Sequence, residues 1–215
     1  MNNARESILA RIRHTLHGDD KPYTNEAVVQ QLRQPSCGPQ PNWQEDDVSR
    51  FISKLESVAG SISRISSADE VVPAITAYLQ QHEIPLKLVT ASSNLLNKLA
   101  WSGDFMVEQR KAAGTDITVV TEAYAGVAET GSLVLLSGAN SPTSLNFLPD
   151  NYLCILRRER LVKHIEDVWQ RLRDEHTGLP RAINFITGPS RTADVEQTIQ
   201  LGAHGPRRLH VILLE

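Results

Sequence analysis

The chain has 215 residues, of which 40% are hydrophobic and 22% are charged, and its formal net charge is −3. This length predicts one domain with or without a short extension, and the composition is that of a globular protein rather than a disordered or fibrous one. The weak negative charge and the aromatic content of only 5% argue against a nucleic-acid surface, and no apolar run is long enough to span a membrane.

The N-terminal segment predicts a helix followed by a linker. Residues 3–16 carry one apolar stripe with arginines on the other faces, which is typical of an amphipathic helix and not of a signal peptide, so we expect a cytoplasmic protein. Polar, proline-rich sequence follows. We therefore predict a helix and linker over residues 1–44 and an α/β domain over residues 45–215. The helix packs on its own domain, on a second copy or on a partner, and the sequence leaves these alternatives open.

From residue 45 onward, helix and strand patterns alternate. Apolar spacing predicts helices over 45–59 and 159–175, one after the capping box Ser67–Glu70, and shorter ones after Ser92 or Ser93 and near 122–126. Short apolar or alternating runs predict strands at 61–65, 86–89, 105–107, 117–120, 132–137, 152–156, 182–186 and 209–214. The alternation favours an α/β fold with a mainly parallel sheet and flanking helices. In such folds, ligands bind beyond the carboxyl ends of the strands.

The cysteines and histidines do not form a recognisable metal site. Cys37 lies in the proline-rich segment, and Cys154 lies within an apolar run, where it is typical of a small core residue. Two isolated cysteines cannot supply the four thiolates of an iron–sulfur cluster. The seven histidines lack the spacing of metal ligands. We expect neither a metal nor a cofactor in this chain.

A polar stretch after the predicted strand 182–186 is the first candidate site. Residues 188–192 read Gly-Pro-Ser-Arg-Thr and precede an expected short helix, whose free N–H groups attract anions. Arg191 would supply a planar fork to a carboxylate or phosphate, with Ser190 and Thr192 as further donors. The alternative is structural: Thr192 caps the helix, and the acidic residues that follow satisfy its dipole.

A glutamate turn is the second candidate site. Glu129-Thr130-Gly131 stands at the mouth of the predicted strand 132–137, where a carboxylate must be paired, hydrated or reactive. If it is reactive, Glu129 is a candidate catalytic residue. As a structural residue, it would accept hydrogen bonds from Thr130, Ser132 or loop N–H groups.

Three stretches of the chain resemble one protein family. Ala128–Ser137, the Leu148–Asp150 corner and Gly188–Glu196 are similar to the LUD-domain family, and within it to the lactate utilization protein C (LutC/YkgG-like) branch. The resemblance covers roughly residues 60–215. It implies a sheet similar to the NagB/RpiA/CoA-transferase-like fold, in which CoA transferases use a glutamate nucleophile followed closely by glycine. The Glu-Thr-Gly of this chain resembles that arrangement, which implies that Glu129 would form an acyl anhydride and pass the acyl group to a thiol.

The resemblance also implies a function and partners. The chain would be a subunit of a cytoplasmic L-lactate oxidising system, without iron–sulfur ligands of its own, and sister subunits would carry the iron–sulfur clusters. It would bind a small carboxylate or a phosphate-bearing ligand, or organise the complex, rather than act as a stand-alone enzyme. Glu129 is the candidate catalytic residue, and the expected ligand-binding residues are Thr130, Gly131, Gly188, Ser190, Arg191 and Thr192.

Two other functions stay open. One is an acyl- or CoA-transferring enzyme that uses Glu129 as its nucleophile. The other is a non-catalytic interaction module, in which the helix and arm over residues 1–40 dock to a partner. Because both lie in loops at strand ends, we expect Glu129 and Arg191 to face one pocket.

Overall fold

The computed structural model describes residues 2–17, 26, 29–30, 38–192, 200–202 and 204–215. The chain divides into two compact units, Met1–Gln40 and Pro41–Glu215, close to residue 44, where composition places the boundary. The first unit contains helix α1 (Asn2–His17), which confirms the helix predicted over 3–16. No helix in the described part of the chain is long and apolar enough to cross a membrane.

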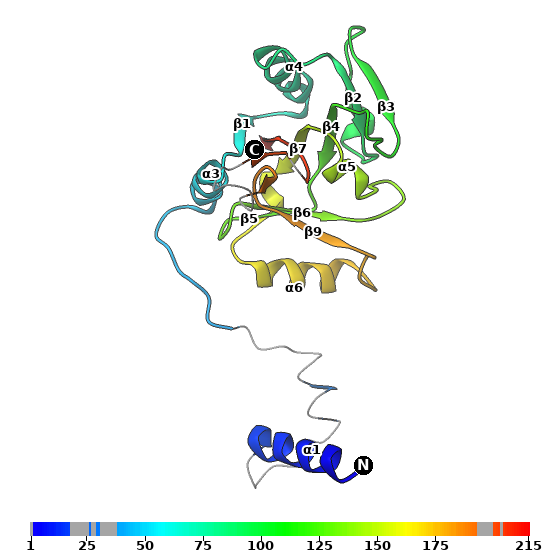
Figure 1. The fold of residues 1–215 in the computed structure, drawn as a ribbon. Coiled ribbons are helices and arrows are strands. Elements are labelled where there is room, and N and C mark those ends of the chain that lie inside the picture. The colour runs from blue at the N-terminus through cyan, green and yellow to red at the C-terminus, as the bar shows by residue number, and fades with distance from the viewer. Residues whose placement is uncertain (1, 18–25, 27–28, 31–37, 193–199, 203) are drawn as a thin grey trace. The chain divides into compact units, whose positions relative to one another are not determined.

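A six-stranded sheet forms the centre of the second unit (Figure 1). Its order is β1-β12-β7-β4-β2-β3, and every neighbouring pair is parallel. This confirms the predicted parallel sheet, whose strands are joined by crossovers. The strands are β1 (Ser61–Ile65), β2 (Lys87–Thr90), β3 (Met106–Gln109), β4 (Thr118–Glu122), β7 (Asn151–Arg157) and β12 (Arg208–Leu214).

Helices precede and connect these strands. α3 (Asp47–Ser57) comes before β1, and the Asp46 carboxylate caps it by accepting hydrogen bonds from the backbone N–H groups of Val48 and Ser49. α4 (Val71–Gln81) lies between β1 and β2 and buries Val71, Ile75, Tyr78 and Leu79. The other helical elements are η1 (Ala68–Glu70), η2 (Leu96–Lys98), α5 (Ser144–Phe147), η3 (Arg158–Arg160) and α6 (Ile165–Glu175).

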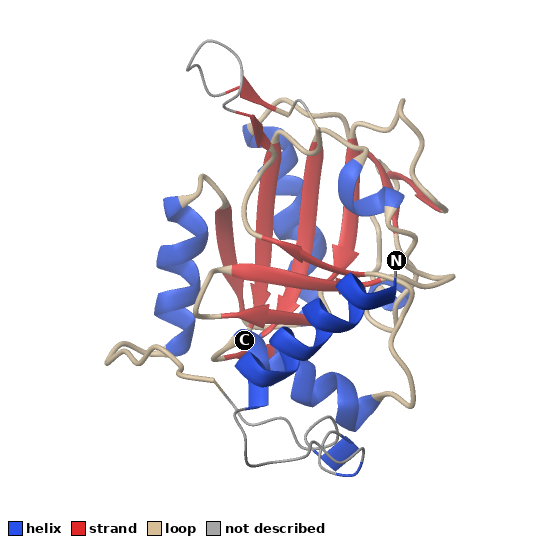
Figure 2. Cartoon of the chain, turned by 60° about the horizontal axis from the view of Figure 1, so that its bottom comes forward, coloured by secondary structure: helices blue, strands red, loops and turns tan. Residues whose placement is uncertain are grey.

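A second, mixed sheet of four strands crosses the first. Its order is β8-β5-β6-β9, in which β5 pairs parallel with β8 and β6 pairs antiparallel with β5 and β9. Figures 1 and 2 show strands of the two sheets running at a steep angle to one another. The strands are β5 (Ala125–Val127), β6 (Ser132–Leu136), β8 (Leu161–Val162) and β9 (Ile183–Ile186), and a separate hairpin pairs β10 (Arg191–Thr192) with β11 (Gln200–Leu201).

Strand β6 joins two hydrophobic cores because its side chains alternate between the faces of the sheet. Leu133 and Leu135 belong to the main core around the parallel sheet. Val134, on the other face, packs with Val168 and Leu172 of α6 in a second core. The mixed sheet therefore lies between the parallel sheet and α6.

Two of the predicted helices are wrong in part or in whole. The segment 122–126 is not helical: β4 ends at Glu122, and the buried strand β5 begins at Ala125 and pairs with β6 and β8. The helix predicted over 159–175 begins only at Ile165, because the residues before it form η3 and β8. It starts with a capping box, in which the Asp167 carboxylate accepts a hydrogen bond of 2.8 Å from the His164 backbone N–H. In both places tertiary pairing overrides the local pattern.

An ion pair ties the connection between β3 and β4. The guanidinium of Arg110 donates to both carboxylate oxygens of Asp116, at 2.6 and 2.8 Å, and the Ala113 N–H donates to the same group at 2.7 Å. The hydrogen bonds from Arg110 are the main cause that holds the pKa of Asp116 at about 2, below its ordinary value of 3.8.

We predict that the free energy of unfolding of Asp116→Asn changes less between pH 5 and pH 2 than that of the wild-type protein. A carboxyl group whose pKa is lowered by folding stabilises the fold above its unfolded pKa, and this contribution is lost as the pH falls toward 2. Because Arg110 is 37% exposed, solvent screens this ion pair. We therefore expect the wild-type protein to be more stable than the variant by about 1 kcal/mol at pH 5. Urea unfolding from pH 5 to pH 2 measures it, with the exposed Asp104→Asn as control. An advantage that stays constant over this range would contradict the prediction.

Candidate functional site

The two sequence motifs meet where β6 begins and β9 ends. These strands run antiparallel, so the Glu129–Gly131 turn lies beside the segment that follows β9. The Ser132 hydroxyl shares hydrogen bonds with Thr130 Oγ1 at 2.7 Å and with Thr187 Oγ1 at 2.5 Å. These three hydrogen-bonded hydroxyls link the two motifs. The hydroxyl of Thr130, a predicted ligand-binding residue, is one of them.

The motif glycines Gly131 and Gly188 have left-handed backbone conformations, with φ of +70° and +94°, which other residues rarely adopt. Both lie against α3 and the residue that follows it. A Cβ on Gly131 would be 2.6 Å from the backbone nitrogen of Leu55, and one on Gly188 would be 2.8 Å from Cγ2 of Val58. The two turns close against α3 because these residues lack side chains, so the glycines have a packing role.

A cavity of about 240 Å³, the motif cavity, opens beside the loop that follows β9. Gly188 and Ser190 of the motif line it, together with the turn His204–Pro206. The Ser190 backbone N–H donates to the Pro206 carbonyl at 2.8 Å, which holds the loop and the turn together. Apolar wall residues are Phe147, Phe185, Ile186 and Leu209.

Two buried polar side chains, Tyr152 and Asn146, also line the motif cavity. The Tyr152 hydroxyl shares a hydrogen bond of 2.7 Å with Thr121 Oγ1 and donates to Asn146 Oδ1 at 3.3 Å. Burial raises the pKa of Tyr152 well above its ordinary value of 10.0. The hydroxyl therefore keeps its proton at neutral pH and stays a hydrogen-bond donor.

The motif cavity lies at the amino ends of the central parallel strands. Tyr152 and Leu209, the second residues of β7 and β12, both line it. We expected the motif loop at the carboxyl ends of parallel strands, where ligands bind in open α/β sheets. That expectation is wrong because the loop follows β9, which belongs to the mixed sheet.

Arg191 and Thr192 do not lie in the predicted loop. They form β10, with Arg191 opposite Leu201 and Thr192 opposite Gln200 in an antiparallel pair. Arg191 is exposed, and it is not among the residues that line the motif cavity. The helix predicted after Thr192 falls on residues 193–199, outside the described residues.

Glu129, the candidate nucleophile, is paired with a histidine. Its Oε2 lies 3.3 Å from Nδ1 of the buried His164, and its side chain is 23% exposed. Trp43 packs edge-on against the imidazole, with 5.0 Å between ring centroids. Like Arg191, Glu129 does not line the motif cavity. A catalytic role for Glu129 and a common pocket with Arg191 stay predictions.

Tyr152 is not among the site residues that the sequence predicts. It is the first residue of a predicted strand that is otherwise apolar, so the pattern assigns it to the hydrophobic core. The only indication of a polar site is that a buried tyrosine hydroxyl needs a hydrogen-bond partner. Asn146 lies in a polar segment whose neighbours the sequence leaves open. Among the residues that the structure describes, no group of three or more His, Cys, Asp or Glu is placed to hold a metal ion.

The family model of the LUD domain matches residues 48–214. The chain belongs to the LUD domain family. The crystal structure of a DUF162 family protein from Deinococcus radiodurans shares this LUD fold with a TM-score of 0.59 at 19% identity, over 81% of this chain and 100% of that one.

Curated relatives support the branch of the LUD family that the motifs resemble. Lactate utilization protein C from Halalkalibacterium halodurans is 30% identical over 176 residues, which are 76% of this chain and 70% of that protein. Uncharacterized protein YkgG from Escherichia coli K12 is 25% identical, over 100% of this chain and 96% of that protein. The resemblance to the lactate utilization protein C branch is thereby confirmed.

We predict that Gly131→Ala destabilises the LUD domain by about 2 to 4 kcal/mol, because the new methyl group meets the α3 backbone in a strained conformation. Gly103→Ala is the matched control, since a Cβ there has no atom within 4 Å, and we expect it to stay within about 0.5 kcal/mol of wild type. Chemical unfolding followed by circular dichroism compares them. Equal stability of the two variants would show that Gly131 has no packing role.

Proposed function

We propose that this chain acts in lactate utilization in the cytoplasm, as a LUD subunit that works with iron–sulfur partner proteins. Its relatives include proteins named lactate utilization protein C from Halalkalibacterium halodurans and Bacillus subtilis. The chain has two cysteines, and burial raises the pKa of the Cys154 thiol to about 12. Such a thiol is a poor metal ligand, so iron–sulfur clusters of the system belong to the partners.

In this proposal the chain binds a small carboxylate, and the partners carry the redox chemistry. The observation that carries the proposal is the motif cavity, where the motif loop and the turn His204–Pro206 meet over buried Tyr152. Its volume of about 240 Å³ suits a small acid better than a dinucleotide. Ser190 and His204 would donate hydrogen bonds to the carboxylate, while the apolar wall covers the rest of the acid.

We predict that a strain lacking this gene fails to grow on L-lactate as sole carbon source and grows normally on glucose. The full-length chain, supplied on a plasmid, should restore growth. A tagged copy, purified without oxygen from lactate-grown cells, should bring down iron–sulfur proteins together with lactate-dependent dye reduction. Undiminished growth of the deletion strain on L-lactate would refute the role in lactate utilization.

We predict that the purified chain binds L-lactate in isothermal titration and that Ser190→Ala weakens this binding about tenfold, as expected for losing a hydrogen bond to a charged group. Ser57→Ala is the control, because its hydroxyl donates to the Lys54 carbonyl in α3 and does not line the motif cavity. If both variants bind lactate equally well, the carboxylate site is not in the motif cavity.

A further inference from the structure

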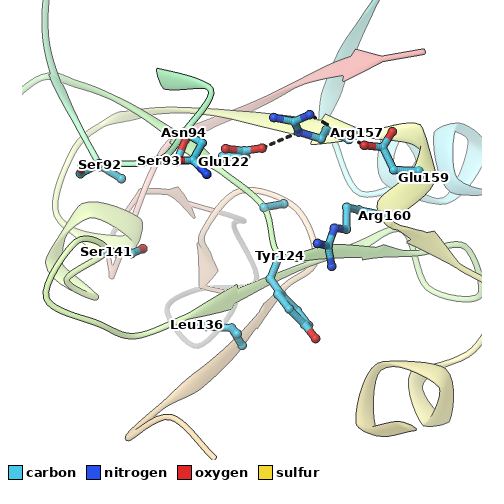
Figure 3. Close-up of a pocket in the computed structure, with 12 residues that line it drawn as sticks. Ser92, Ser93, Asn94, Glu122, Tyr124, Leu136, Ser141, Arg157, Glu159 and Arg160 are labelled. Carbon is cyan, nitrogen blue, oxygen red and sulfur yellow. Dashed lines mark hydrogen bonds and ion pairs between the residues drawn. The ribbon is translucent and has the colours of Figure 1, made fainter. Parts of the chain in front are cut away.

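A second and larger cavity, about 390 Å³, lies at the opposite ends of the parallel strands (Figure 3). We call it the carboxyl-end cavity, because it is lined by Ala91 after β2, by Glu122 at the end of β4 and by Arg157 at the end of β7. Open α/β sheets bind ligands at this end of their strands. None of the site residues predicted from the sequence lines it.

Strand pairing places the first pair of charges in the carboxyl-end cavity. β4 and β7 are parallel with Glu122 opposite Ile155, so Arg157, two residues further along, projects from the same face. Arg157 Nε donates to Glu122 Oε1 at 2.7 Å, which orients the guanidinium. Glu159 lies 3.8 Å from Arg157 Nη1 and is 67% exposed, so this second acid is held only loosely.

Arg160 is held against the cavity by α6. Its Nη1 donates to both carboxylate oxygens of Glu175, at 2.7 and 2.9 Å, and its guanidinium carbon lies 5.7 Å from the centre of the Tyr124 ring. Burial raises the pKa of Glu175, but the hydrogen bonds from Arg160 contribute to a net lowering, which keeps the acid ionised. Because both bonds use Nη1, Nε and Nη2 of Arg160 have no partner among the described residues, and a planar donor edge is open.

Uncharged groups complete the carboxyl-end cavity. Figure 3 shows Ser92, Ser93 and Asn94 across from Arg160, on the loop that follows β2. Below these groups in the same view are Leu136 and the Tyr124 ring, and the ring adds a flat apolar surface. The cavity therefore combines hydrogen-bond donors for an anion with a surface for a planar body.

We propose that the carboxyl-end cavity is a second ligand site, which binds one carboxylate or phosphate group of a ligand whose planar apolar body rests on Tyr124. The open edge of Arg160 and the guanidinium of Arg157 hold the anion, and the Ser92–Asn94 loop supplies further donors. Glu122 and Glu159 lie beside Arg157, and Glu175 lies between Arg160 and Arg171, so the surrounding charges balance and the site suits a single anionic group rather than a polyphosphate. This site is independent of lactate binding in the motif cavity.

Isothermal titration with phenyl phosphate, benzoate, inorganic phosphate and acetate tests this site. The two aromatic probes share a planar body and differ in their anion, so they separate a phosphate ligand from a carboxylate ligand. We expect at least one of them to bind tenfold or more tightly than its free anion. Arg160→Gln should weaken that binding at least tenfold, and Arg160→Lys, which keeps the charge without the fork, should weaken it less.

Arg173→Gln and Ser57→Ala are the controls. Arg173 contacts Gln170 within α6, the Ser57 hydroxyl donates to the Lys54 carbonyl, and neither residue lines either cavity, so both variants should bind the probes like wild type. If Arg160→Gln does not fold, Tyr124→Leu replaces it and should reduce the advantage of the aromatic probes over their free anions to less than threefold. Absence of binding at millimolar probe, or equal loss of binding in either control, would overturn the proposal.

Discussion

Strand β7 is the structural constraint on which both cavities depend. It is buried over residues 151–156 and pairs in parallel with β4 on one side and β12 on the other. A strand enclosed in this way cannot shift by one residue without moving its side chains to the opposite face. Its register therefore holds Tyr152 in the motif cavity at one end and Arg157 in the carboxyl-end cavity at the other.

The LUD motifs serve packing as much as chemistry. Gly131 and Gly188 let two turns close against α3, and the Ser132 hydroxyl connects the turns to one another. These contacts explain why a motif rich in glycine and hydroxyl residues marks this part of the fold. Of the motif residues, Gly188 and Ser190 also line the motif cavity. The buried polar side chains of that cavity, Asn146 and Tyr152, come instead from α5 and β7.

The two cavities differ in their electrostatics. The polar groups that line the motif cavity are hydroxyls, an amide and an imidazole, and among the described residues its lining contains no guanidinium group. The carboxyl-end cavity contains two guanidinium groups that nearby carboxylates hold in place, and charged planar forks bind carboxylate and phosphate more strongly than neutral donors. The LUD domain thus has two chemically distinct cavities at opposite ends of its parallel strands, and we propose an anion for each.

The amino-acid sequence by itself determined the alternation of helices and strands, the parallel sheet and the family, because apolar periodicity and short motifs are local signals. It did not determine the mixed sheet, since β5 and β8 are short and owe their strand conformation to pairing with each other across more than thirty residues. Nor did it show that Ser190 lines the same cavity as Tyr152, or that the Glu129 carboxylate pairs with the His164 imidazole. Tertiary structure alone decided these, because the end of a sheet at which a loop emerges depends on contacts between segments far apart in the chain.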